Sequence, residues 1–110
     1  MTVKELTEKL SLEILSMPDP EREITGGYTG DLLSWVMGRA QEGDAWVTIM
    51  SNQNTVAVAT LADVACVILA EQSEADASLI TLAENKGINL FRSAMSAFTL
   101  SAEIGALLKA

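Results

Sequence analysis

The chain has 110 residues, of which 49% are hydrophobic, and fifteen acidic residues outweigh seven basic ones to give a formal net charge of −8. A chain of this length can bury the core of one domain without a disulfide or a metal ion. The charge opposes binding to nucleic acid or to an anionic membrane, because both require a positive patch and the Lys and Arg residues are scattered.

No segment predicts export or a membrane span. The first ten residues mix charged and apolar side chains without the apolar core of a signal peptide, and the apolar runs are too short to cross a bilayer. The single cysteine, Cys66, cannot form an internal disulfide and lies in the apolar run Val64–Leu69. We therefore expect a buried, unreactive thiol and a cytoplasmic protein.

The first predicted elements are short. A helix is expected over residues 2–9, because Thr2 and Glu5 form a capping box and apolar residues follow on one helical face. Residues 11–15 alternate as a strand does, and two prolines then break the chain. Residues 23–25 are predicted to form a second short strand that leads into a cluster of glycines.

That glycine cluster, Gly26, Gly27 and Gly30, is the most distinctive local pattern of the chain. Glycine accepts positive φ and allows close backbone approach, so the cluster marks either a tight structural turn or a place where a ligand or partner meets the main chain. Asp31 follows directly and is expected to cap a helix. The core stripe of that helix is predicted to comprise Leu32, Leu33, Val36, Met37 and Ala40.

The middle of the chain alternates strands and helices. Residues 45–50 are predicted to form a buried strand and residues 55–61 a two-turn helix. Residues 65–70 are apolar throughout, as in a strand of a sheet that is covered on both faces.

The alternation continues to the end of the chain. Ser73 is expected to cap a helix that Gly87 ends, residues 88–91 form a strand, and Ser96 begins the last helix. The order predicts a single compact α/β domain with a largely parallel (mixed) sheet of about four to five strands between helix layers.

Several segments together resemble the DRTGG domain, a small module of some HPr kinase/phosphorylase relatives and certain pyrophosphatases that also occurs alone. The matching segments are Glu21–Arg22, Thr25–Gly27, Gly30–Ser34, Gly43–Ile49 and Asn54–Ala59. The resemblance implies a fold like the N-terminal domain of HPr kinase/phosphorylase and no catalytic activity, because this domain does not perform phosphoryl transfer. Asp19 or Glu21 stands for the acidic residue of the motif, and either carboxylate could pair with Arg22.

The chain lacks the residues that the common catalytic sites require. A P-loop requires a lysine and a hydroxyl residue after its last glycine, and Asp31 stands there instead. We therefore interpret the glycine segment as a structural turn, with a phosphate cradle as the alternative. In such a turn the Asp31 carboxylate would accept an amide near Leu33 or Ser34, and Gly27 would be needed for the backbone geometry. The chain has no histidine, which removes the usual general base and most zinc sites. No catalytic residue, metal or cofactor is expected.

A polar segment, Thr48–Asn54, follows the predicted central strand, and crevices beyond the carboxyl ends of parallel strands are where such folds bind ligands. The alternative is that Asn54 caps the next helix and its neighbours bond the local backbone. Candidate ligand or partner contacts are Gly26, Gly27, Tyr28, Thr29, Gly30, Asp31, Ser34, Thr48, Ser51, Asn52 and Asn54.

The leading functional prediction is a non-catalytic regulatory or protein-interaction module that works as a homodimer. The high apolar content supports it, and residues 55–62 with the last helix could supply a self-complementary patch. Trp35 and Trp46 are expected to be core or interface anchors, with Trp35 at the rim. The alternative is a small-ligand domain that senses adenine nucleotides.

Overall fold

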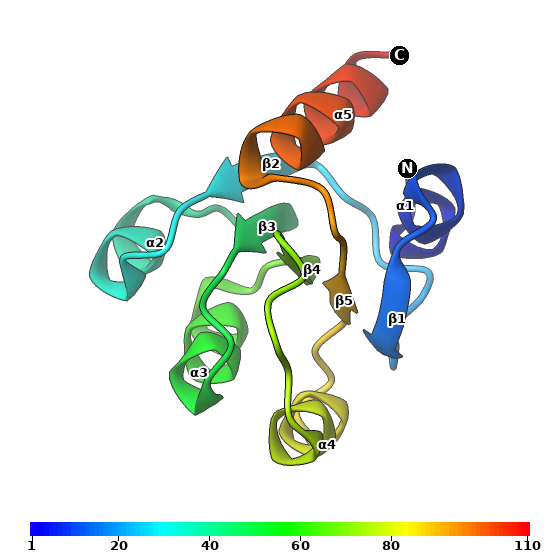
Figure 1. Ribbon diagram of the computed structural model, residues 1–110. Coiled ribbons are helices and arrows are strands. Elements are labelled where there is room, and N and C mark those ends of the chain that lie inside the picture. Colours follow the sequence, from blue (N-terminus) through cyan, green and yellow to red (C-terminus); the bar gives the residue numbers. More distant parts are fainter.

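A mixed sheet lies between two layers of helices in the computed structural model, which describes residues 1–110 (Figure 1). The strands are β1 (Glu13–Ser16), β2 (Gly26–Thr29), β3 (Asp44–Thr48), β4 (Cys66–Leu69) and β5 (Leu90–Arg92). The helices are α1 (Val3–Leu10), α2 (Leu33–Arg39), α3 (Gln53–Ala62), α4 (Ala77–Asn85) and α5 (Ala97–Lys109). The predicted α/β class with a mixed sheet is confirmed.

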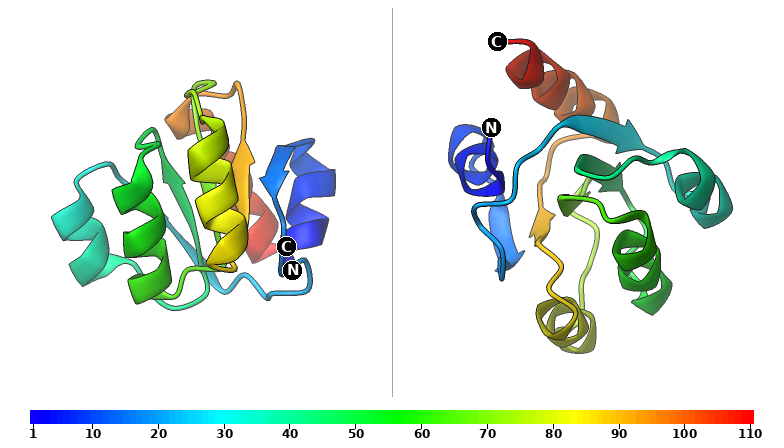
Figure 2. Two further views of the ribbon diagram at one scale, coloured as in Figure 1. Left: turned by 90° about the horizontal axis from the view of Figure 1, so that it is seen from below. Right: turned by 180° about the vertical axis from the view of Figure 1, so that it is seen from behind.

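The order of the strands explains where the helices lie. The sheet runs β1-β5-β4-β3-β2, with β2 to β5 parallel and β1 antiparallel to β5. Each parallel strand is added on the same side of the previous one, so right-handed crossovers place α2, α3 and α4 on one face. Figure 2 shows these three helices in a row. The terminal helices α1 and α5 pack on the other face, and no helix has the length and apolar composition that crossing a membrane requires.

Two hydrophobic cores, one on each face, hold the layers together. Along β3, Ala45 and Val47 face α1 and α5, whereas Trp46 faces the three crossover helices. Along β4, Cys66 likewise faces the terminal helices and Val67 faces the crossover helices. Because side chains alternate across a strand, a strand that is covered on both faces is apolar at nearly every position, which is why the apolar run of residues 65–70 predicted β4 correctly. In β3 the buried exceptions, Asp44 and Thr48, are both hydrogen-bonded.

Three predicted helix ends are confirmed: the start of α1, the start of α5 and the end of α4. Thr2 and Glu5 form the expected capping box of α1, and the Ser96 hydroxyl accepts the amide of Thr99 at the start of α5. Gly87 has a φ of +73°, the left-handed conformation expected after a helix.

Two other predicted caps are wrong by a few residues. The carboxylate of Asp76, not Ser73, caps α4 by accepting the amide of Leu79 at 2.8 Å. Ser73 instead donates its hydroxyl to the carbonyl of Ala70 and so remains in the turn after β4. At α3 the cap is Asn52, whose side chain accepts the amide of Asn54.

The predicted core stripe of α2 is confirmed only in part. Val36 is buried, and Leu33 and Ala40 pack partly buried against the same core. Leu32 is 58% exposed and Met37 is 42% exposed, so these two are wrong. The physical reason is position: α2 is short and lies at the end of the row of helices, where it packs against α3 on one side only. Its buried strip is therefore narrower than the sequence pattern indicated.

Cys66 is expected to be inert in the folded protein. Burial in the apolar core raises the pKa of its thiol to about 12, so the thiolate is scarce at mildly alkaline pH. An aromatic disulfide reagent should therefore release no thiolate chromophore from the native protein and one equivalent after unfolding in guanidinium. Rapid labelling of the native chain would contradict the burial.

Candidate functional site

The glycine segment forms an edge strand, not the predicted turn. Gly26–Thr29 is β2 itself, whereas Glu23, in the stretch predicted to be a strand, makes only an isolated bridge to Thr2. The strand pairs with β3 in continuous register, and no strand lies on its other side. None of its glycines has positive φ. The expectation that Gly27 is needed for the backbone geometry of a turn is therefore wrong.

The three glycines differ in the space around them. A Cβ at Gly26 would lie 2.7 Å from the Asp44 carboxylate, and one at Gly30 would lie 3.0 Å from the Tyr28 ring. At Gly27 the nearest atom would be the carbonyl oxygen of Ala45, at the ordinary contact distance of 3.5 Å. A side chain at Gly26 would displace the Asp44 carboxylate and one at Gly30 would crowd the Tyr28 ring, whereas Gly27 has room for a side chain.

Arg22 and Thr25, which carry the family resemblance, have structural roles. The Arg22 guanidinium donates to the Asp63 carboxylate at 3.1 Å and to the Asp63 carbonyl at 2.9 Å, so it stabilises the C-terminus of α3 and does not pair with Asp19 or Glu21 as predicted. The Thr25 amide donates to the carbonyl of Gly43 at 3.0 Å. The motif thus ties the start of β2 to the end of α3 and to the turn before β3.

Asp31 is not the cap of α2. The helix begins at Leu33 without any side-chain cap, and the Asp31 carboxylate turns toward the end of β3 instead. One carboxylate oxygen accepts the Thr48 hydroxyl at 2.8 Å and the Ile49 amide at 2.9 Å. Asp31 therefore joins the carboxyl ends of two neighbouring strands, an interaction that sequence spacing could not show.

The other polar candidates beyond β3 do not form one pocket. Asn52 and Asn54 serve the cap of α3. Ser51 borders a shallow depression whose other polar side chains are the acidic Glu74 and Asp76, and Ser34 is exposed on α2. Apart from the local bond between Asn52 and Asn54, the hydrogen bond that joins two of these candidates runs from the Thr48 hydroxyl to the Asp31 carboxylate.

A cleft of about 230 Å³ lies between β2, β3 and α5. It is lined by Gly27, Tyr28, Thr29, Ala45, Val47, Ser101, Ile104, Gly105 and Leu108. The hydroxyls of Thr29 and Ser101 share a 2.6 Å hydrogen bond across its boundary, and both residues also line a second depression beside Phe98. We call this continuous surface the β2–α5 cleft. Its lining consists of glycines, residues with hydroxyl groups and apolar residues, and includes no charged residue.

The α5 side of this cleft was not predicted from the sequence. The sequence indicated the last helix only as part of a self-complementary patch, and nothing in it singled out Ser101, Ile104 or Gly105 as the lining of a cleft. One signal was present: Ala97, Ser101 and Gly105 are spaced four apart and so lie on one helical face, which is lined with small side chains.

Comparison with known proteins identifies the fold. No protein-family model and no curated protein matches the sequence. Among solved structures, the chain is similar to the CBS and DRTGG domains of the regulatory region of Clostridium perfringens pyrophosphatase, complexed with the activator diadenosine tetraphosphate. The TM-score is 0.70 at 18% identity, over 92% of this chain and 44% of that chain. The chain has a DRTGG-like fold. This likeness confirms at the level of the fold the resemblance that the sequence segments indicated.

A substitution at Gly43 tests the contact between the motif residue Thr25 and the turn before β3. It has a φ of +83°, and a Cβ there would collide with the hydroxyl of Thr25. Gly87 has a similar φ but nothing within 4 Å of its virtual Cβ. In denaturant titrations Gly87→Ala should lower the free energy of unfolding by about 1 to 2 kcal/mol, the usual left-handed penalty, and Gly43→Ala by more. Equal losses would mean that the contact with Thr25 is unimportant.

Asp31 should matter for stability through its acceptor oxygen. Asp31→Ala removes two hydrogen bonds and should lower the free energy of unfolding by about 1 to 2 kcal/mol. Asp31→Asn keeps an acceptor oxygen and should lose less, as thermal or denaturant unfolding can measure. A fully stable Asp31→Ala variant would show that these bonds contribute nothing.

Proposed function

We propose that this chain is a non-catalytic regulatory module that acts by binding, and that it works as a homodimer. The observation that carries the proposal is the chemistry of the β2–α5 cleft. Its hydroxyls have no carboxylate, imidazole, amine or thiol in the lining to activate them for attack on a substrate. Backbone, hydroxyls and apolar surface are instead what a binding surface needs.

The polar groups elsewhere support the same conclusion. Asp31 and Thr48 bond each other at the carboxyl ends of the strands, and Asn52 caps a helix, so their polar atoms already have structural partners. The DRTGG-like fold adds a second line of support, because the solved relative with this fold is a regulatory region.

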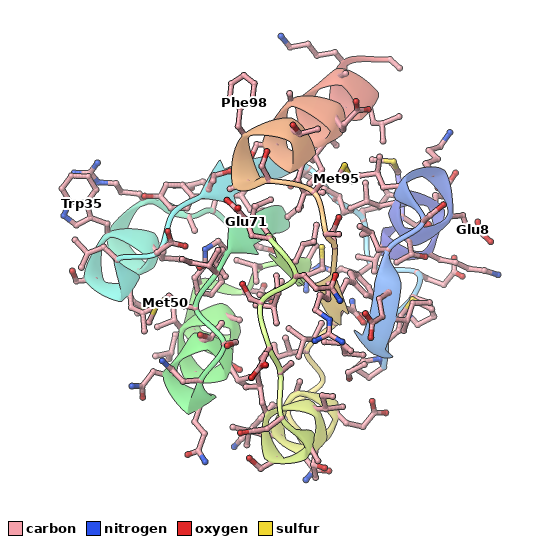
Figure 3. The ribbon with its side chains drawn as sticks, in the orientation of Figure 1. Glu8, Trp35, Met50, Glu71, Met95 and Phe98 are labelled. Carbon is pink, nitrogen blue, oxygen red and sulfur yellow. The ribbon has the colours of Figure 1, made fainter.

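Several large apolar side chains remain exposed, as a partner surface would require. Phe98 on α5 is 84% exposed and Trp35 on α2 is 52% exposed. Figure 3 shows Phe98 and Trp35 standing away from the body of the molecule. Association of two copies would cover part of this apolar surface.

A sensor of adenine nucleotides is the second candidate, since the structural relative was complexed with diadenosine tetraphosphate. The positive charge that phosphates require is not gathered, however. Arg22 pairs with Asp63, Arg92 pairs with Glu13 at 2.8 Å, and the Arg39 guanidinium lies 3.8 Å from the centre of the Trp35 ring. We therefore favour the regulatory homodimer over the nucleotide sensor.

Nucleotides provide the test of the proposed function. Incubation with ATP and Mg²⁺ should leave the ATP intact, because the cleft has no carboxylate or imidazole to activate an attacking water and no cationic side chain to hold the phosphates. Thermal shift with AMP, ATP and diadenosine tetraphosphate should leave the melting temperature unchanged. Turnover that persists through repurification would make the chain an enzyme, and a saturable thermal shift would favour the sensor.

A further inference from the structure

The two edges of the sheet are protected very differently. At the outer strand β1, Glu13 forms an ion pair with Arg92, and the register is irregular between Ile14 and Ser16. A proline, Pro18, follows two residues after the strand. Charge, irregular register and proline are the features by which edge strands avoid pairing with other chains.

The opposite edge, β2, has none of these protections. Its four residues include no charge and no proline, and they pair with β3 in unbroken register from Gly26 to Thr29. Gly27 and Thr29 are exposed. The backbone groups that point away from β3 have no strand beside them, so this edge presents an open template for a further strand.

The surface beside this edge is also free of charge. The residues of α5 that line the depression next to Thr29 are Ala97, Phe98, Ser101 and Ala102. The other hollows differ, since Lys86 lines the groove between α3 and α4, and Glu74 and Asp76 line the depression near Ser51. Two copies of a chain with a net charge of −8 repel each other where charged surfaces meet, so an uncharged surface is where they can approach.

Two glycines of the cleft have no explanation within a single chain. A Cβ at Gly105 would meet nothing within 4 Å, although glycine in the middle of a helix is destabilising relative to alanine. Gly27, on the strand side of the same cleft, would meet only the Ala45 carbonyl at an ordinary distance. Missing side chains at both positions leave room for something that approaches from outside.

We propose that the open edge of β2 and the adjoining face of α5 form the surface through which two copies of this chain associate, with the two β2 strands paired antiparallel about a twofold axis. Such an interface is self-complementary and continues the sheet from one copy into the next. A foreign acidic or basic peptide fits less well, because the edge offers no charge to recognise it. The inference rests on the proposed homodimer and names its surface.

Matched charge insertions test this surface. Light scattering over a micromolar dilution series should give a dimer for the wild type. Phe98→Glu and Thr29→Glu each bring like charges together across the interface and should weaken dimerisation by about 100-fold or more. Leu61→Glu is the matched control, since it makes the same change at a residue that is 72% exposed on α3, and it should leave the dimer intact.

The outcomes separate the two proposals. A wild-type monomer at every concentration would overturn the homodimer itself. A wild-type dimer that both Phe98→Glu and Thr29→Glu leave unchanged would overturn only the assignment of its surface, and dissociation by Leu61→Glu would move that surface to α3. If Thr29→Glu impairs folding, Phe98→Glu decides, because Phe98 is 84% exposed and its loss removes little internal packing.

Hydrogen exchange tests the strand pairing directly. Amides of β2 that point outward should exchange more slowly at high protein concentration than at low concentration, and this difference should vanish in Phe98→Glu. Concentration-independent exchange in β2, with protection confined to α5, would show that the helices associate without strand pairing.

Discussion

Burial of the central strands on both faces is the constraint on which the rest of this structure depends. Every residue of β3 and β4 is buried. Two apolar faces cannot be satisfied by one layer of helices, so the chain must cover both. The crossover helices α2, α3 and α4 cover one face, and the terminal helices α1 and α5 complete the other.

This arrangement engages most interior polar groups in structural bonds. Asn89, which is buried, donates to the carbonyls of Asp19 and Ala65 and so fixes the loop after β1 against the start of β4. Ser16 reaches Glu84 at 2.7 Å, and no buried side-chain polar atom lacks a partner. Arg22 of the motif likewise donates to Asp63 and so fixes the segment before β2 against the end of α3. What remains for function is therefore at the surface, and above all at the edge where β2 meets α5.

A partner that binds at the edge of the sheet contacts both a strand and a helix of the fold. The Thr29 and Ser101 hydroxyls already join β2 to α5, so a partner that contacts one element also contacts the other. Phe98 lies beside this junction and carries the largest exposed apolar fraction among the large hydrophobic residues of the chain. A binding event there could act on the sheet through β2 without any chemical step, which is the kind of role that a regulatory module needs.

The sequence by itself determined the features that arise within a few residues. The apolar run of residues 65–70 indicated a doubly covered sheet. Thr2 and Ser96 marked helix starts because an N-cap accepts an amide only a turn away, and Gly87 marked a helix end because glycine tolerates positive φ. Tertiary structure alone decided the partner of Asp31, the close packing around Gly26 and the cleft under α5. Thr29 and Ser101 are 72 positions apart, and no local pattern records that two such residues will touch. The candidate site depends on contacts of this kind, which form only when the layers of the fold pack together.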